Sequence, residues 1–189
     1  MKQQYYDILE QNPVIAAVKN KEGLLACCKR EDIRVVFVLY GDICNITDIV
    51  QKIKDSGKLA VVHADLVSGL SGKEIAVDYL KTHTKTDGFI STKPPLVKRG
   101  RELGLLSILR IFVLDSMALE NINKQILLAD PDAIEILPGL MPKIISRVVR
   151  MTKLPVIAGG LISEKEDVVA ALSAGAISVS TTNEKVWLL

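Results

Sequence analysis

Ionisable side chains occur within, or at the ends of, several short apolar runs in this sequence. Along the chain they are Lys19, His63, Asp65, Lys93 and Glu135. If these runs are parallel strands, His63 and Asp65 point to the same face because they are two residues apart. Carboxylates accept hydrogen bonds from hydroxyl groups, and ammonium groups donate to them. The set therefore predicts a binding site for a polyol.

A structural explanation of the same residues stays open. Lys19 or Lys93 can lie on the surface, and Asp65 can pair with Arg110 in the interior. Against this explanation, four separate runs carry ionisable groups, and burying charges without partners or a ligand is costly. We therefore expect a ligand-binding cup and assign no residue in it a catalytic role.

Two segments near the end of the chain have the composition of a phosphate site. Gly159 and Gly160 follow one apolar run, and Ser180 and Thr181 end the next. Adjacent glycines let backbone amides approach a phosphate closely, and the hydroxyl groups offer further contacts to its oxygens. Asn183 is expected to open a short final helix whose positive end faces the anion. The sequence thus predicts that these two segments bind the phosphate of a ligand.

The elements that position these residues are Val- and Ile-rich runs, separated by segments whose apolar residues recur at helical spacing. The expected strands are Pro13–Lys19, Arg34–Tyr40, Lys58–Leu66, Gly88–Thr92, Ser107–Leu114, Asp132–Pro138, Pro155–Gly159 and Ala176–Thr181. This alternation is typical of a parallel α/β protein. Eight units of about 24 residues approach the minimum for a (β/α)8 barrel of the TIM type, expected as one domain over residues 1–189 with a truncated last helix. An open doubly wound sheet is the alternative, but no Gly-x-Gly-x-x-Gly follows the first strand.

Local signals indicate where several helices begin. Asn45 is a candidate N-cap, either Pro94 or Pro95 suits a first helical position, and so does Pro142. Two segments match capping boxes, Ser71–Glu74 and Ser163–Glu166. In a barrel of this type, the loops after strands seven and eight form a recurrent phosphate site. The glycines and hydroxyl residues described above fall in these two loops.

The composition excludes several classes of protein. The 189 residues include 24 Lys and Arg against 22 Asp and Glu, a net charge of +2, so no overall field favours nucleic acid or a membrane. No apolar run approaches the roughly 18 residues that a membrane span needs, and residues 1–11 lack the pattern of a signal sequence. The three cysteines have neither an even count nor metal-ligand spacing. These features indicate a cytoplasmic protein without a disulfide framework, a metal site or a membrane partner.

Two groups of basic residues lie on expected helices. One occupies residues 98–101, and the other consists of Lys143, Arg147 and Arg150, whose spacing of four and three residues forms a single stripe. Contact with nucleic-acid phosphates is one interpretation of the stripe. An ordinary solvated face of the outer helices is the other.

Five motifs follow one another along the chain. They are Val62-His63-Ala64-Asp65-Leu66 with Gly69-Leu70, Gly88-Phe89-Ile90-Ser91-Thr92-Lys93, Glu135-Ile136-Leu137-Pro138-Gly139 with Pro142-Lys143, Ala158-Gly159-Gly160-Leu161-Ile162, and Ser178-Val179-Ser180-Thr181. In this order, and over nearly the full length, the chain resembles the glycerol-uptake operon antiterminator regulatory proteins of bacteria. The resemblance implies a small barrel that binds glycerol 3-phosphate as its effector, with no other cofactor. It also implies action on a leader mRNA to prevent premature termination of glycerol-utilisation genes.

Other functions stay open on the residues alone. In a sugar-phosphate lyase, isomerase or epimerase, Lys93 would form a Schiff base while Asp65 or Glu135 acts as acid or base. A structural barrel without a ligand is a further alternative. The truncated final helix leaves apolar surface near the last strand, and a second subunit covering it would make a homo-oligomer.

Overall fold

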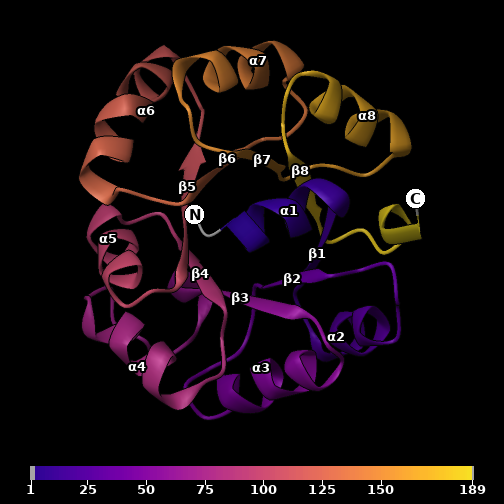
Figure 1. Ribbon diagram of the computed structural model, residues 1–189, viewed down its shortest axis with the longest axis vertical. Helices are drawn as coiled ribbons and strands as arrows, with labels where there is room; N and C mark the ends of the chain where they lie inside the picture. The colour runs from indigo at the N-terminus through magenta and orange to yellow at the C-terminus, as the bar shows by residue number, and fades with distance from the viewer. Residues whose placement is uncertain (1–2, 189) are drawn as a thin grey trace.

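The computed structural model describes residues 3–188, in which eight parallel strands close into a barrel (Figure 1). Each strand pairs with the next along the chain, and the last pairs with the first. The strands are β1 (Val14–Val18), β2 (Val35–Val38), β3 (Leu59–His63), β4 (Gly88–Ser91), β5 (Leu106–Phe112), β6 (Ala133–Leu137), β7 (Val156–Gly159) and β8 (Ser178–Thr181). The (β/α)8 barrel predicted from the alternation of apolar runs is therefore confirmed.

Seven helices follow the strands and form a ring around the barrel (Figure 1). They are α2 (Lys21–Cys28), α3 (Ile46–Asp55), α4 (Ile75–His83), α5 (Pro94–Glu102), α6 (Ser116–Ala129), α7 (Pro142–Met151) and α8 (Lys165–Ser173). In place of an eighth helix, a single 3-10 turn, η2 (Val186–Leu188), lies between α8 and α2. The buried indole of Trp187 donates to the carbonyl of Thr181 over 2.9 Å and so fixes this shortened end to β8.

The core has two layers, as parallel strands buried on both faces require. One layer fills the barrel interior with side chains such as Ile15, Phe37 and Ile108. The other lies between the strands and the surrounding helices. No helix within residues 3–188 combines the length and apolar character needed to cross a membrane.

A helix that the sequence analysis did not predict, α1 (Gln3–Gln11), precedes the first strand. It lies across one end of the barrel (Figure 1), where Tyr5 and Leu9 pack on the interior layer. Because this layer includes Ile15 and Val35 at the start of their strands, α1 closes the amino-terminal end. Functional groups are thereby confined to the opposite end, where the strands finish.

Several expected boundaries were wrong. The third strand stops at His63, and Ala64–Leu66 forms a 3-10 turn, η1, so His63 and Asp65 do not share a strand face. The helix after Ser71 begins only at Ile75, with no capping side chain. The capping box of α8 uses Glu164 and Asp167 rather than Ser163–Glu166. Asn45 does precede α3, but its side chain bonds to Asp42 instead of capping the helix.

Candidate functional site

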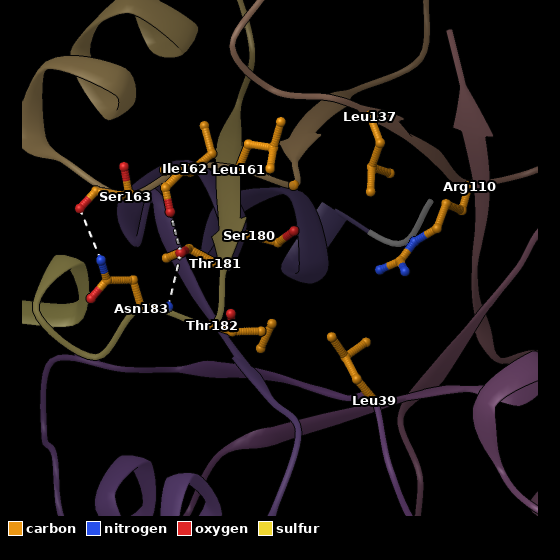
Figure 2. A pocket seen from close by; sticks show the side chains of 12 residues that line it. Leu39, Arg110, Leu137, Leu161, Ile162, Ser163, Ser180, Thr181, Thr182 and Asn183 are labelled. Atoms are coloured by element: carbon orange, nitrogen blue, oxygen red, sulfur yellow. Dashed lines mark hydrogen bonds between the residues drawn. The ribbon is translucent and has the colours of Figure 1, made fainter. Parts of the chain in front are cut away.

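A pocket of about 520 Å³ opens at the carboxyl ends of the strands, chiefly over β7 and β8 (Figure 2). Its polar lining comes from Arg110, from Gly160 and Ser163 after β7, and from the segment Ser180–Asn183. Arg110 is the one charged side chain among the lining residues, and none of them is acidic. The pocket therefore favours an anionic ligand.

The end of β7 and the turn after it combine a close approach at Gly159 with left-handed backbone at the next two residues. A Cβ atom on Gly159 would lie 2.5 Å from Glu135 Oε1 and 2.7 Å from Ser180 Oγ, so no larger residue fits there without displacement. The next two residues, Gly160 and Leu161, have φ of 77° and 64°. For Leu161 this left-handed conformation costs about 1–2 kcal/mol, and such strain is concentrated at functional sites.

Hydrogen bonds join the loops after β7 and β8 into one wall. Thr181 Oγ1 donates to the carbonyl of Ile162 over 2.7 Å and accepts from the amide of Asn183 over 3.0 Å. Asn183 Nδ2 donates to the carbonyl of Ser163 over 2.9 Å (Figure 2). The hydroxyl group of Thr181, predicted to bind phosphate, thus holds this wall together.

Backbone amides on the wall are available to an anion. In the part of the chain that the structure describes, the N–H groups of Gly160, Leu161 and Thr182 donate to no turn, loop or cap acceptor. Amides left without an internal acceptor need water or a ligand as a partner. Together they offer a phosphate the kind of backbone cradle that glycine-containing loops provide.

A buried chain of polar side chains forms the inner side of the pocket. Arg110 Nε donates to Glu135 Oε2 over 2.6 Å, and the hydroxyl of Ser180 donates to Glu135 Oε1. Glu135 is 0% exposed, so its charge is compensated by Arg110 rather than by water. Arg110 and Glu135 are register partners on β5 and β6, which aims both side chains into the barrel.

The terminal nitrogens of Arg110 are directed into the pocket (Figure 2). Within residues 3–188 they donate no hydrogen bond, since Nε alone contacts Glu135. A planar guanidinium with free donors is suited to phosphate, carboxylate or hydroxyl oxygens. The predicted pairing of Arg110 with Asp65 is wrong, because its partner is Glu135. The signal that identifies this pair is opposite charges at paired positions of neighbouring inward-facing strands.

Asp65 belongs to a separate network beside β4. Burial alone would raise the pKa of its carboxyl group, but the amide of Thr92 at 2.7 Å and the hydroxyls of Ser91 and Thr92 hold that pKa below its usual value. Lys93 Nζ lies 3.6 Å from Asp65 Oδ1. Asp65 is therefore an anion at neutral pH, held in place by β4 residues and paired with a half-exposed lysine.

His63 is buried beneath this network, with 3% of its surface exposed. Its Nδ1 has no hydrogen-bond partner among the described residues and lies 4.0 Å from Asp65 Oδ2. Burial, and then the charge of Arg110, lower the pKa of His63 to about 4 against the opposing effect of Asp65. The imidazole is therefore neutral at pH 7 and can offer one donor and one acceptor.

The structure divides the predicted site residues between neighbouring places. Gly160, Ser180 and Thr181 line the pocket, whereas Gly159 is buried behind its wall against Glu135. Neither His63 nor Asp65 is among the lining residues, and Lys93 lines a second hollow of about 560 Å³. Lys19, just after β1, is exposed and is not part of the lining.

No group of three or more His, Cys, Asp or Glu side chains within residues 3–188 is arranged to hold a metal ion. The predicted basic stripe of Lys143, Arg147 and Arg150 lies on α7, outside the barrel and away from the pocket lining. The functional groups at the carboxyl ends of the strands therefore favour binding of a small anion through amides and a guanidinium.

A family model described as glycerol-3-phosphate responsive antiterminator matches residues 14–187. The chain belongs to this family. It is a family of regulators, and its model spans all eight strands of the barrel. The resemblance inferred from the five sequence motifs is confirmed.

Individual relatives agree with this membership. The chain is 47% identical over 182 residues to the uncharacterized protein YgcP of Escherichia coli K12, covering 96% of this chain and 95% of that protein. The glycerol uptake operon antiterminator regulatory protein of Listeria monocytogenes superposes with a TM-score of 0.89 at 32% identity, over 93% of this antiterminator-family chain and 94% of that one. An antiterminator-related protein from Thermotoga maritima gives a TM-score of 0.83 at 31% identity, over 94% and 99% of the two chains.

Enzymes with this barrel are more distant. The N-acetylmannosamine-6-phosphate 2-epimerase of Clostridium perfringens gives a TM-score of 0.71 at 15% identity, over 97% of this antiterminator-family chain and 93% of the epimerase. At that identity the similarity shows the fold alone. Lys93, the candidate Schiff-base residue, faces the carboxylate of Asp65 outside the pocket lining. The family and this placement agree with a regulator rather than a lyase or isomerase.

Proposed function

We propose that the pocket over β7 and β8 binds glycerol 3-phosphate, and that binding regulates antitermination on the leader mRNA of glycerol-utilisation genes. The observation that carries the ligand half of the proposal is a lining without acidic residues that combines free amides with Arg110. A phosphate suits the amides, and the hydroxyl groups of the glycerol suit the guanidinium. The proposed action on messenger RNA rests on family membership. If the protein acts on transcripts, its location is the cytoplasm, where transcripts are made.

The two ends of the ligand have different partners in this proposal. The phosphate contacts the amides of Gly160, Leu161 and Thr182, next to the strained turn after β7. The glycerol hydroxyls extend toward the terminal nitrogens of Arg110. Glu135 and Ser180 contribute by holding the guanidinium in place, since both oxygens of Glu135 already accept hydrogen bonds.

Asp65, Lys93 and His63 have an indirect role in this arrangement. They lie beside the pocket and not in its lining, so they bind the polyol only if it extends past Arg110 toward β3 and β4. Lys19 is exposed just after β1 and has no assigned contact with the ligand in this proposal.

Calorimetric titration of the wild type and two glycine variants tests the ligand half. Gly160→Ala places a methyl group 3.0 Å from Leu137 Cδ2 in the pocket wall, at a φ of 77°. Gly57→Ala is the matched control, because its φ is 75° and nothing lies within 4 Å of the added atom. Both changes introduce the same left-handed alanine, at a cost of about 1 kcal/mol. Only Gly160→Ala changes the pocket.

We expect saturable binding of glycerol 3-phosphate to the wild type and to Gly57→Ala, and binding weakened at least tenfold in Gly160→Ala. No saturation at millimolar ligand would overturn the proposal, as would equal affinity in the two variants. The RNA half is tested by transcription in vitro from a template with the leader of a glycerol-utilisation operon. We expect protein and glycerol 3-phosphate together to change the fraction of transcripts that pass the terminator, and an unchanged fraction refutes regulation.

A further inference from the structure

The structure distinguishes the two basic groups that the sequence contains. On α5, Arg99 pairs with Asp78 at 2.6 Å and with Glu102 at 3.2 Å, while Arg101 pairs with Asp130 at 3.1 Å. The charges of these arginines are therefore compensated within the protein. The two arginines therefore offer little attraction to an external polyanion, and Lys98 is the one exposed basic residue of this group without an ion pair in the described chain.

The basic stripe on α7 has no such compensation. Lys143, Arg147 and Arg150 are all exposed, and none forms an ion pair with another residue that the structure describes. Arg150 Nη1 donates to the hydroxyl of Ser146 over 2.7 Å, which uses a neutral partner. Residues 142–151 contain no Asp or Glu. Three unpaired positive charges therefore lie along one face of the helix.

Two of these charges, Lys143 and Arg150, border a groove of about 410 Å³ between α7 and α8. The α7 side presents Lys143, Ser146 and Arg150, and the α8 side presents only the small residues Ala170, Ser173 and Ala174. The charged residues of α8 lie in its first turn, at residues 165–167, where Asp167 is held in the capping box. The part of the groove next to Arg150 is thus basic on one wall and sterically open on the other.

We infer that this basic groove, lined by Lys143 and Arg150 of α7 and by the small residues of α8, binds the sugar-phosphate backbone of RNA together with the neighbouring exposed Arg147 of α7. The inference rests on the proposed function, which supplies the polyanion. Lys143 and Arg150 are seven positions apart on the helix, a rise of about 10 Å, which is comparable to the span of four consecutive phosphates of one strand at about 3.4 Å per step. Such contacts position an RNA without reading its sequence.

A direct contact connects this groove to the ligand pocket. The amide of Gly139, in the loop between β6 and α7, donates to the carbonyl of Gly160 over 3.0 Å. A Cβ atom on Gly139 would lie 2.9 Å from Ile162 Cδ1, so the two loops are packed as closely as a glycine allows. Helix α7 begins three residues later, at Pro142. A ligand that moves the Gly160 turn therefore moves the start of the RNA-binding helix, which gives the two sites a route of coupling.

Two triple variants of equal charge test the groove. Lys143→Gln, Arg147→Gln and Arg150→Gln together remove the stripe. The control combines Lys81→Gln, Lys98→Gln and Lys124→Gln, three exposed lysines on α4, α5 and α6 with no ion pair in the described chain. Both sets lower the net charge from +2 to −1, since 2 − 3 = −1. Glutamine has a helix propensity close to that of lysine and arginine.

Fluorescence anisotropy with a labelled leader transcript, from 50 to 200 mM salt, measures the affinity. We expect the groove variant to bind at least tenfold more weakly than the wild type, with a salt slope reduced by about 2, since each single-strand phosphate contact contributes about 0.7. We expect the control to retain wild-type affinity within about twofold. Equal loss in both variants, or no loss in the groove variant, overturns the inference.

Two further measurements separate the possible causes of failure. If the wild type binds glycerol 3-phosphate but no RNA, the messenger RNA half of the proposed function fails together with the groove. If the groove variant keeps its RNA affinity but changes its mass in sedimentation, the groove contacts a second copy of the chain and the inference is wrong. Glycerol 3-phosphate affinity should be the same in both triple variants, and a loss confined to the groove variant would mean that its pocket is damaged.

Discussion

Replacing Arg110 by methionine removes the charge that compensates Glu135 inside the barrel. Glu135 is 0% exposed, and its remaining partner in the described chain would be the hydroxyl of Ser180. Removing one partner of a buried ion pair costs about 3–5 kcal/mol, because the other charge stays buried without compensation. In a chain of this size about 1 kcal/mol shifts Tm by roughly 2–4 °C, so we expect Tm to fall by about 6–20 °C.

A double-mutant cycle with Glu135→Gln measures this effect by thermal and denaturant unfolding. With its amide oxygen accepting from Arg110 Nε and its amide nitrogen donating to the hydroxyl of Ser180, the glutamine keeps both contacts without the charge. Arg110 also keeps contact with the pocket solvent, so Glu135→Gln alone should cost about 1–3 kcal/mol. The double variant has no buried charge left and should be more stable than Arg110→Met alone. A cost below about 1 kcal/mol for Arg110→Met, or a double variant that loses the sum of both single effects, would refute the reasoning.

Two other predictions concern the buried histidine and the amino-terminal helix. The pKa of His63 is lowered to about 4 from an ordinary value of 6.5, so the unfolded chain binds a proton at this residue more readily than the folded chain does. The free energy of unfolding should therefore decrease as the pH falls from about 6.5 toward 4. That loss should reach about 3 kcal/mol in the wild type, and a curve of the same slope in His63→Gln would contradict it. Leu9 is 1% exposed and closes the barrel interior. Leu9→Ala should lower the free energy of unfolding by about 2–5 kcal/mol. A change below about 1 kcal/mol in urea titration would mean that α1 does not close the barrel.

Most of the barrel could be predicted because its strands are buried on both faces and therefore consist of nearly continuous apolar runs. The position of the pocket wall followed from the same strand order, since Gly160 follows β7 and Thr181 ends β8, next to the loops that this fold uses for anions. Helix α1 was missed although Tyr5, Ile8 and Leu9 have helical spacing. A helix of nine residues gives a weak local signal, and packing against the barrel stabilises it.

The parts of the site that could not be predicted depend on contacts between distant segments. The turn at Asp65 is fixed by hydrogen bonds from Thr92, which no local pattern around Asp65 contains. Arg110 and Glu135 are paired because of the register of β5 and β6. A shift of that register by one residue would have placed the two side chains on opposite faces of the sheet. The division of the ionisable residues between the pocket and its surroundings follows from these two contacts.

The most direct test of the central claim is a crystal structure of the protein with glycerol 3-phosphate. We expect a phosphate within about 3 Å of the amides of Gly160, Leu161 and Thr182, with the glycerol hydroxyls facing the terminal nitrogens of Arg110. A phosphate bound in the hollow beside Lys93, or an empty pocket at saturating ligand, would contradict it.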